Sequence, residues 1–270
     1  MSIPGLPPKQ GLYDPAQEKD SCGIGFVVNI KGQKSHTIVE QGLQILENLS
    51  HRGAQGCDPC TGDGAGILLQ VPHDFLKRAA GDVGVSLPQA GEYGVGMLFL
   101  PPQVDARQQC EALFAKIIAE EGARLLGWRD VPVKNDAIGP VARSTEPFMR
   151  QVFIARDVLN EGQFERKLYV IRKRIETAVR ESAILGRDYF YISSLSANTI
   201  VYKGLLLPHQ MSAYYQDLKD ERLASALALV HSRFSTNTFP TWPLAHPYRY
   251  ICHNGEINTL KGNVNWMRAR

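Results

Sequence analysis

The chain has 270 residues, of which 44% are hydrophobic and 21% are charged. These are the proportions of an ordinary globular protein with a core of its own. The net charge of +3 is too small to indicate a nucleic-acid partner, and no apolar run is long enough to span a membrane. The five cysteines are an odd number, which disfavours a closed disulfide framework and favours a reducing cytoplasm.

The first 21 residues differ in composition from the rest of the chain. They contain four prolines and scattered charges, and they offer little apolar surface to bury. They also lack the apolar centre of a secretory signal. We expect residues 1–21 to be a leader and residues 22–270 to form one domain.

The hydrophobic pattern predicts strands near both ends of the chain and helices between them. The first strand, 24–30, is apolar enough to be buried on both faces. A helix is expected after an N-cap at Asn160, with Gln163 as its capping-box partner. This order favours stacked antiparallel sheets covered by helices over alternating strand–helix–strand units. Further strands are expected at 67–71, 93–100, 151–155, 189–196, 199–206, 227–234 and 250–257, and further helices at about 39–49 and 105–121.

Cys22 stands where the leader meets the first expected strand. A cysteine attacks as the thiolate, and an ordinary pKa of about 8.5 leaves little thiolate at neutral pH without a base. Removal of residues 1–21 would give Cys22 a free α-amine, with a pKa of about 7.7–8.0, that can serve as this base. The alternative is a small buried structural cysteine.

Three further clusters contain residues suited to anion binding. Arg233 ends an apolar strand, where its guanidinium can bind a carboxylate through two parallel bonds or can simply face solvent. Asn254 and Gly255 form a tight turn, which is either a hairpin tip or a pair of donors for an oxyanion. Arg52 follows the first helix and either satisfies its last carbonyl groups or lines an anion pocket.

Taken in order, these motifs resemble the class II glutamine amidotransferase domain. The motifs are Cys22-Gly-Ile-Gly, His51-Arg52-Gly53, His231-Ser-Arg233-Phe-Ser-Thr236 and His253-Asn254-Gly255. Segments 49–55, 61–67, 194–204 and 237–247 are similar, more narrowly, to the large-subunit family of glutamate synthases. The resemblance implies an α+β fold, the four-layer αββα sandwich of two antiparallel sheets of the N-terminal-nucleophile hydrolases.

The resemblance also implies roles for single residues. Cys22 would become the first residue of the mature enzyme after loss of a propeptide, and its sulfur would attack the γ-amide of L-glutamine. Its α-amine would carry the proton, while Asn254 and Gly255 hold the oxyanion. Arg233 would bind the α-carboxylate of the substrate.

The remaining substrate-binding residues implied by the resemblance are Arg52, His231 and Thr236. For His231 we expect a structural role in supporting the loops rather than acid–base work. In this family an acidic residue that holds the substrate amino group follows the Asn-Gly motif, but no Asp or Glu follows Glu256 here. We therefore expect the domain to be truncated at its C-terminal end.

Glutamate synthases use the released ammonia in a much longer chain. There it aminates 2-oxoglutarate beside FMN and a 3Fe-4S cluster, so the resemblance implies that this segment holds no cofactor and belongs to a larger cytoplasmic oxidoreductase of glutamate biosynthesis. Its partners would be L-glutamine, the remaining domains of the large subunit, and either a small subunit with FAD and NADPH or ferredoxin. NADPH, NADH and ferredoxin all stay open as electron donors, as does the oligomeric state.

Other interpretations compete with this one. Cys57 and Cys60 form a C-x-x-C pair, typical of zinc or redox modules, but a structural zinc site needs four ligands and a glycine-rich turn explains the pair as well. The basic run 172–174 lies opposite the apolar stripe of its helix, so we expect a solvated face rather than a nucleic-acid site. The chain could also be the glutaminase domain of another class II amidotransferase, or a non-catalytic lobe that docks a partner.

Overall fold

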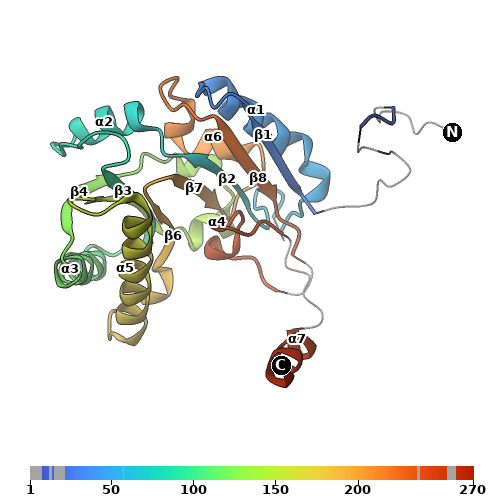
Figure 1. Ribbon diagram of the computed structural model, residues 1–270. Helices are drawn as coiled ribbons and strands as arrows, with labels where there is room; N and C mark the ends of the chain where they lie inside the picture. Colours follow the sequence, from blue (N-terminus) through green and yellow to red (C-terminus); the bar gives the residue numbers. More distant parts are fainter. Residues whose placement is uncertain (1–7, 12–13, 15–21, 57, 236–237, 254–259) are drawn as a thin grey trace.

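The computed structural model describes residues 8–11, 14, 22–56, 58–235, 238–253 and 260–270. In this part of the chain, eight strands pair into two four-stranded antiparallel sheets (Figure 1). The first sheet contains, in spatial order, β1 (Ile24–Val28), β8 (Leu227–Ser232), β2 (Ala65–Gln70) and β7 (Thr199–Gly204). The second contains β4 (Arg124–Asp130), β5 (Phe148–Ala155), β3 (Tyr93–Leu100) and β6 (Tyr191–Ser196).

Helices cover both sheets (Figure 1). Helix α1 (His36–Asn48) packs against β1 and β8, and α3 (Val104–Glu120) and α5 (Glu161–Glu181) cover the outer face of the second sheet. The four-layer α+β sandwich expected from the sequence is therefore confirmed. The shorter helices are α2 (His73–Gly81), α4 (Pro140–Ser144), α6 (Gln210–Tyr214) and α7 (Leu260–Ala269), with 3-10 turns at Ser50–Arg52, Asn135–Ala137, Arg187–Tyr189, Gln216–Lys219 and Trp242–Leu244.

Local contacts explain where α1 lies and where α5 begins. A side chain on Gly42 of α1 would place its Cβ only 2.7 Å from the Cβ of Ala228, so this glycine lets α1 lie directly on β8. Helix α5 begins as the sequence predicts, because the Asn160 side chain accepts from Gln163 N at 2.9 Å and the Gln163 side chain accepts from Asn160 N at 3.1 Å. This capping box satisfies two donors of the first turn.

Strand β1 differs from the expectation that it is buried on both faces. It lies at the edge of the described sheet, where it pairs with β8, and its exposure alternates along the strand. Phe26 is 66% exposed, and Ile24 and Val28 on the same face are also exposed. An apolar run does not distinguish an edge strand from a central one, and this explains the error.

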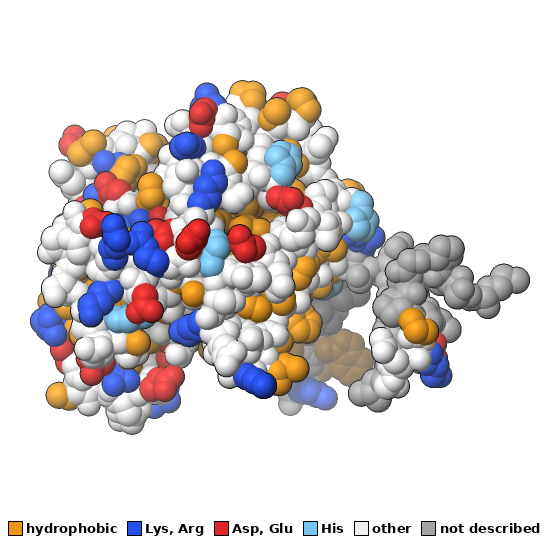
Figure 2. Space-filling model, turned by 90° about the horizontal axis from the view of Figure 1, so that it is seen from above, with side chains coloured by type: hydrophobic (Ala, Val, Ile, Leu, Met, Phe, Trp, Pro, Cys, Tyr) orange, Lys and Arg blue, Asp and Glu red, His pale blue; other side chains and the backbone are white. Residues whose placement is uncertain are grey.

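The expected strand 250–257 is also wrong where it can be checked. Residues 250–253 have no regular structure, and 254–257 lie outside the described residues. The basic run forms ion pairs, since Arg172 and Lys173 pair with Glu176, while Arg174 pairs with Glu120, the last residue of α3, and with Glu121, its C-cap. On the face in Figure 2, basic and acidic side chains are likewise interspersed.

A buried ion pair ties the two sheets together. Arg129 of β4 donates to Asp217 through both terminal nitrogens, at 2.8 and 2.7 Å. The Tyr202 hydroxyl of β7 donates to the same carboxylate at 3.0 Å, and Gln151 of β5 accepts from Arg129 at 3.0 Å. Because every charge in this network has a partner, it fixes the first sheet against the second without an unpaired buried ion.

We expect Arg129→Met to lower the free energy of unfolding by about 3–5 kcal/mol, because it leaves the Asp217 carboxylate buried and uncompensated. The double variant Arg129→Met/Asp217→Leu should recover most of this loss. Urea unfolding of the three proteins measures both values. Equal losses in the single and double variants would show that the ion pair itself, rather than the orphaned charge, carries the energy.

Candidate active site

Cys22 is placed by the pairing of β1 with β8. The register sets Ile24 opposite His231, and the amide of Ser232 donates to the carbonyl of Gly23 at 2.7 Å. The sulfur of Cys22 then lies 3.0 Å from Nε2 of His231. Two residues that are 209 positions apart in the sequence thus meet at the end of the first sheet.

Two glycines allow the chain to close around Ser232. A Cβ on Gly23 would collide with the Ser232 carbonyl oxygen, and one on Gly53 would collide with the Ser232 hydroxyl. The same Cβ on Gly23 would lie 3.3 Å from the Cβ of Arg52. Arg52, in the 3-10 turn after α1, therefore packs beside the residue that follows Cys22.

Arg233 comes directly after β8 and is buried, with 4% of its surface exposed. Its terminal nitrogens donate to the Asp63 carbonyl at 3.3 Å and to the Thr238 hydroxyl at 2.9 Å. Among the described residues, its Nε has no hydrogen-bond partner and its guanidinium has no salt bridge. A buried cation with neutral partners is a favourable site for an anionic ligand. Burial lowers the pKa of Arg233, and the nearby Asp63 carboxylate opposes that effect.

The imidazole next to Cys22 is held in its neutral form. Burial, together with His253 and Arg233, lowers the pKa of His231 to about 4. The ring of His246 lies against it, with centroids 4.9 Å apart, and burial with the same kind of positive neighbours lowers the pKa of His246 to about 3. His231 is therefore a weak proton acceptor at neutral pH. A thiol at this position needs a different base.

Cys252 and His253, which precede the Asn-Gly motif, also lie at this end of the first sheet. The amide of His253 lies 3.3 Å from Nδ1 of His246, and the Cys252 sulfur contacts the Val230 carbonyl. Burial raises the pKa of the Cys252 thiol to about 12, so this second cysteine is unsuited to act as a nucleophile. Three expected site residues, Thr236, Asn254 and Gly255, lie outside the described residues.

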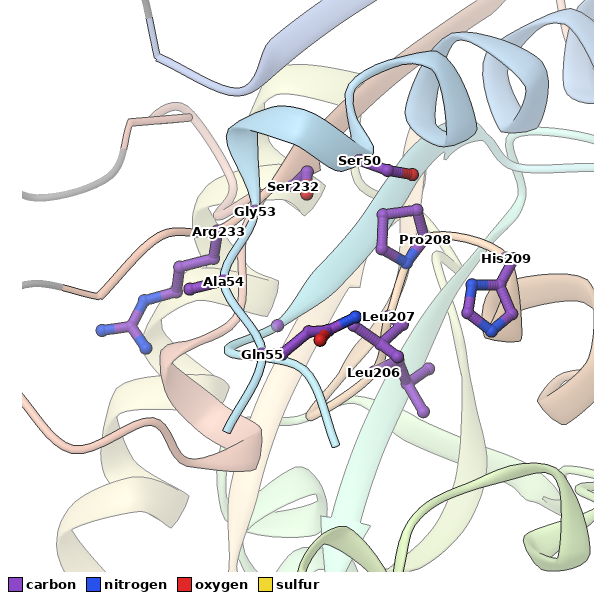
Figure 3. A pocket seen from close by; sticks show the side chains of 11 residues that line it. Ser50, Gly53, Ala54, Gln55, Leu206, Leu207, Pro208, His209, Ser232 and Arg233 are labelled. Carbon is purple, nitrogen blue, oxygen red and sulfur yellow. The ribbon is translucent and has the colours of Figure 1, made fainter. Parts of the chain in front are cut away.

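A small cavity adjoins this arrangement (Figure 3). It is lined by the backbone near Gly53 and Ser232 and by Leu206, Pro208 and neighbouring residues, and Cys22 is not among them. Its volume of about 70 Å³ is far below the several hundred Å³ typical of ligand pockets. The Arg233 guanidinium points away from it (Figure 3), so this cavity is not the anion site.

The zinc interpretation gains no support from the described residues. Cys57 lies outside them, and Cys60 is exposed in a turn closed by the Asp58 carboxylate, which accepts from Cys60 N and the Thr61 hydroxyl. No group of three or more His, Cys, Asp or Glu side chains in the described ranges is arranged to hold a metal ion. None of the helices described there is long and apolar enough to cross a membrane.

The structure adds site residues to which sequence reasoning gave no role. The His246 ring packs at a tilt against that of His231, the Tyr248 ring packs at a tilt against that of His246 with centroids 4.2 Å apart, and the Asp63 carboxylate accepts from Ser235 N at 2.6 Å. Lys203 is fully buried and lies in register with His231 across the first sheet. The only sequence signal for it was a lysine within an otherwise apolar strand.

We expect His231→Gln to flatten the dependence of stability on pH. Between pH 6.5 and 4 the His231 imidazole takes up a proton in the unfolded chain but not in the folded protein, where it is buried. The free energy of unfolding therefore falls as the pH falls through this range. The contribution is on the order of 3 kcal/mol. Urea unfolding at several pH values measures it, and part of the slope should remain because of His246. A slope unchanged in the variant would mean that His231 takes up a proton as readily in the folded protein as in the unfolded chain.

Comparison with known proteins agrees with this geometry. The family described as class-II glutamine amidotransferases matches residues 22–270. The chain is 54% identical over 273 residues to the glutamate synthase [NADPH] large chain of Bacillus subtilis, covering 100% of this chain and 18% of that protein. It is 46% identical to the glutamate synthase [NADH] of Schizosaccharomyces pombe, covering 98% of this chain and 13% of the relative. It is 42% identical to the chloroplastic ferredoxin-dependent glutamate synthase of Oryza sativa, covering 96% of this chain and 16% of the relative.

The chain thus spans less than a fifth of the length of these relatives. The family match begins at Cys22, the residue that the fold places against His231, and it covers every described strand. The chain belongs to the class-II glutamine amidotransferase family.

Proposed function

We propose that this chain is the glutaminase domain of a glutamate synthase large subunit and that Cys22 is its nucleophile. The observation that carries the proposal is the contact between the Cys22 sulfur and a histidine whose charged form is disfavoured by burial. Because His231 is a weak proton acceptor, another group has to take the proton of the Cys22 thiol. The α-amine of Cys22, released by cleavage after Ser21, is the group that lies within reach of its own side chain.

In the first half of the reaction the α-amine takes the thiol proton while sulfur bonds to the γ-carbonyl carbon of glutamine. The carbonyl electron pair moves to oxygen, where the Asn254 side-chain amide and the Gly255 N–H stabilise the oxyanion. A donor of this kind contributes roughly 2.7–4 kcal/mol. When the intermediate collapses, the C–N bond breaks, the ammonium gives its proton to the leaving nitrogen, and ammonia departs from a γ-glutamyl thioester.

In the second half, water attacks the thioester and the α-amine accepts its proton. The C–S bond then breaks, the thiol recovers a proton from the ammonium, and glutamate is released. The substrate is held by Arg233, whose guanidinium binds the α-carboxylate, with Arg52, His231 and Thr236 completing the pocket.

The domain, residues 22–270, would supply ammonia to a larger protein that aminates 2-oxoglutarate. FMN and the 3Fe-4S cluster would belong to the other domains of that protein, and its partner would be either a small subunit with FAD and NADPH or ferredoxin. Relatives named for NADPH, NADH and ferredoxin resemble this chain to similar degrees, so the domain does not select the electron donor. A cytoplasmic, reducing setting suits a nucleophile that must remain a thiol.

We expect Cys22→Ala to abolish release of glutamate from glutamine, since it removes the thiol that lies 3.0 Å from His231 Nε2. The matched control is Cys60→Ala, which removes an exposed thiol in the turn closed by Asp58 and should leave the rate unchanged. A coupled assay for glutamate measures both. Turnover by the Cys22→Ala protein at the wild-type rate would exclude Cys22 as the nucleophile.

We expect Arg233→Lys to raise KM for glutamine by about 10–100-fold with little change in kcat, because a lysine cannot bind a carboxylate through two parallel bonds. The control is Arg124→Lys, an exposed surface arginine paired with Asp157. Steady-state kinetics distinguish the two. An unchanged KM in the Arg233→Lys protein would show that the carboxylate binds elsewhere.

A further inference from the structure

Lys203 of β7 is buried in a way that needs an explanation. None of its surface is exposed, and in the described part of the chain no carboxylate forms a salt bridge with it. Its Nζ donates to the Tyr191 hydroxyl at 3.1 Å and to the Pro243 carbonyl at 3.0 Å. The amine also lies 4.7 Å from the Tyr191 ring centroid and 4.1 Å from that of Tyr248. Burial of an amine without a counter-ion destabilises a fold, so the residue is not explained by stability.

The register of the first sheet relates Lys203 to the active site. Lys203, Gly66 and His231 face one another across β7, β2 and β8. Gly66 has no side chain, and a Cβ there would collide with the His246 carbonyl oxygen. The segment 243–253 therefore crosses the sheet at Gly66, between the lysine and the histidine that contacts Cys22.

Both of these side chains contact the crossing segment. Lys203 binds the Pro243 carbonyl and the Tyr248 ring, while the His231 ring supports that of His246. A further contact joins His253 N to His246 Nδ1. His253 is the residue before Asn254.

We propose that Lys203 is a positioning residue of the glutaminase reaction, which clamps segment 243–253 onto the first sheet and so fixes where the chain enters the Asn254-Gly255 motif. The inference rests on the proposed function, in which that motif holds the oxyanion. Lysine suits the task because a flexible stem delivers several N–H donors to one point, where they reach the Tyr191 hydroxyl and the Pro243 carbonyl beside the Tyr248 ring. Burial and the positive charges of Arg172 and Arg233 lower the pKa of its amine.

The test compares Lys203→Met with Lys116→Met, which removes an exposed lysine of α3. We expect kcat for glutamine hydrolysis to fall about 100-fold, the loss typical of one displaced oxyanion donor, while KM stays nearly constant. Alkylation of Cys22 by iodoacetamide should keep its rate, because that reaction forms no oxyanion. Hydrogen exchange at the amides of Tyr248 and His253 should become faster in Lys203→Met only.

Unchanged exchange in segment 243–253 would overturn the proposal, as would faster exchange with an unchanged kcat. If Lys203→Met does not fold, Tyr248→Leu removes the ring from the other side of the same contact. This variant should likewise lower kcat while KM stays nearly constant. A wild-type protein that hydrolyses no glutamine would disprove the proposed function. The exchange comparison would still decide whether Lys203 holds the segment.

Discussion

The antiparallel pairing of β1 with β8 is the constraint on which the rest of the site depends. It brings Cys22 to His231 and sets Arg233 one residue beyond the strand end. The pairing is possible at this end because Gly23 has no side chain to collide with the Ser232 carbonyl. The proposed nucleophile, the histidine beside it and the proposed anion site therefore lie at the adjoining ends of two strands, and the register of these strands fixes all three.

Burial then determines which of these groups can accept a proton and which can bind an anion. It keeps the His231 imidazole neutral, so the thiol proton has to go to another acceptor, and it leaves the Arg233 cation with neutral partners that a carboxylate can supplement. In a chain that retains its leader, the nitrogen of Cys22 is part of a peptide bond and has no basic lone pair. Under the proposed mechanism, residues 1–21 thus act as a chemical lock on the nucleophile.

Local patterns in the sequence predicted much of this fold, and non-local contacts explain what they missed. Strand 93–100 and the capping box of α5 depend on neighbouring residues and are found as predicted. Strand β4 was missed because Gly127 and the buried Arg129 interrupt its apolar pattern. The motifs identified Cys22 and Arg233, but Lys203 becomes meaningful only once the register sets it in line with His231, and register is not visible along a single strand.

If the α-amine of Cys22 is the catalytic base, the chain must be cleaved between Ser21 and Cys22. Mass spectrometry of the N-terminal peptide tests this in protein that is actively releasing glutamate from glutamine. We expect this peptide to begin at Cys22. Active protein in which the peptide still begins at Met1 would contradict this expectation, since Cys22 would then have no free amine to accept the proton.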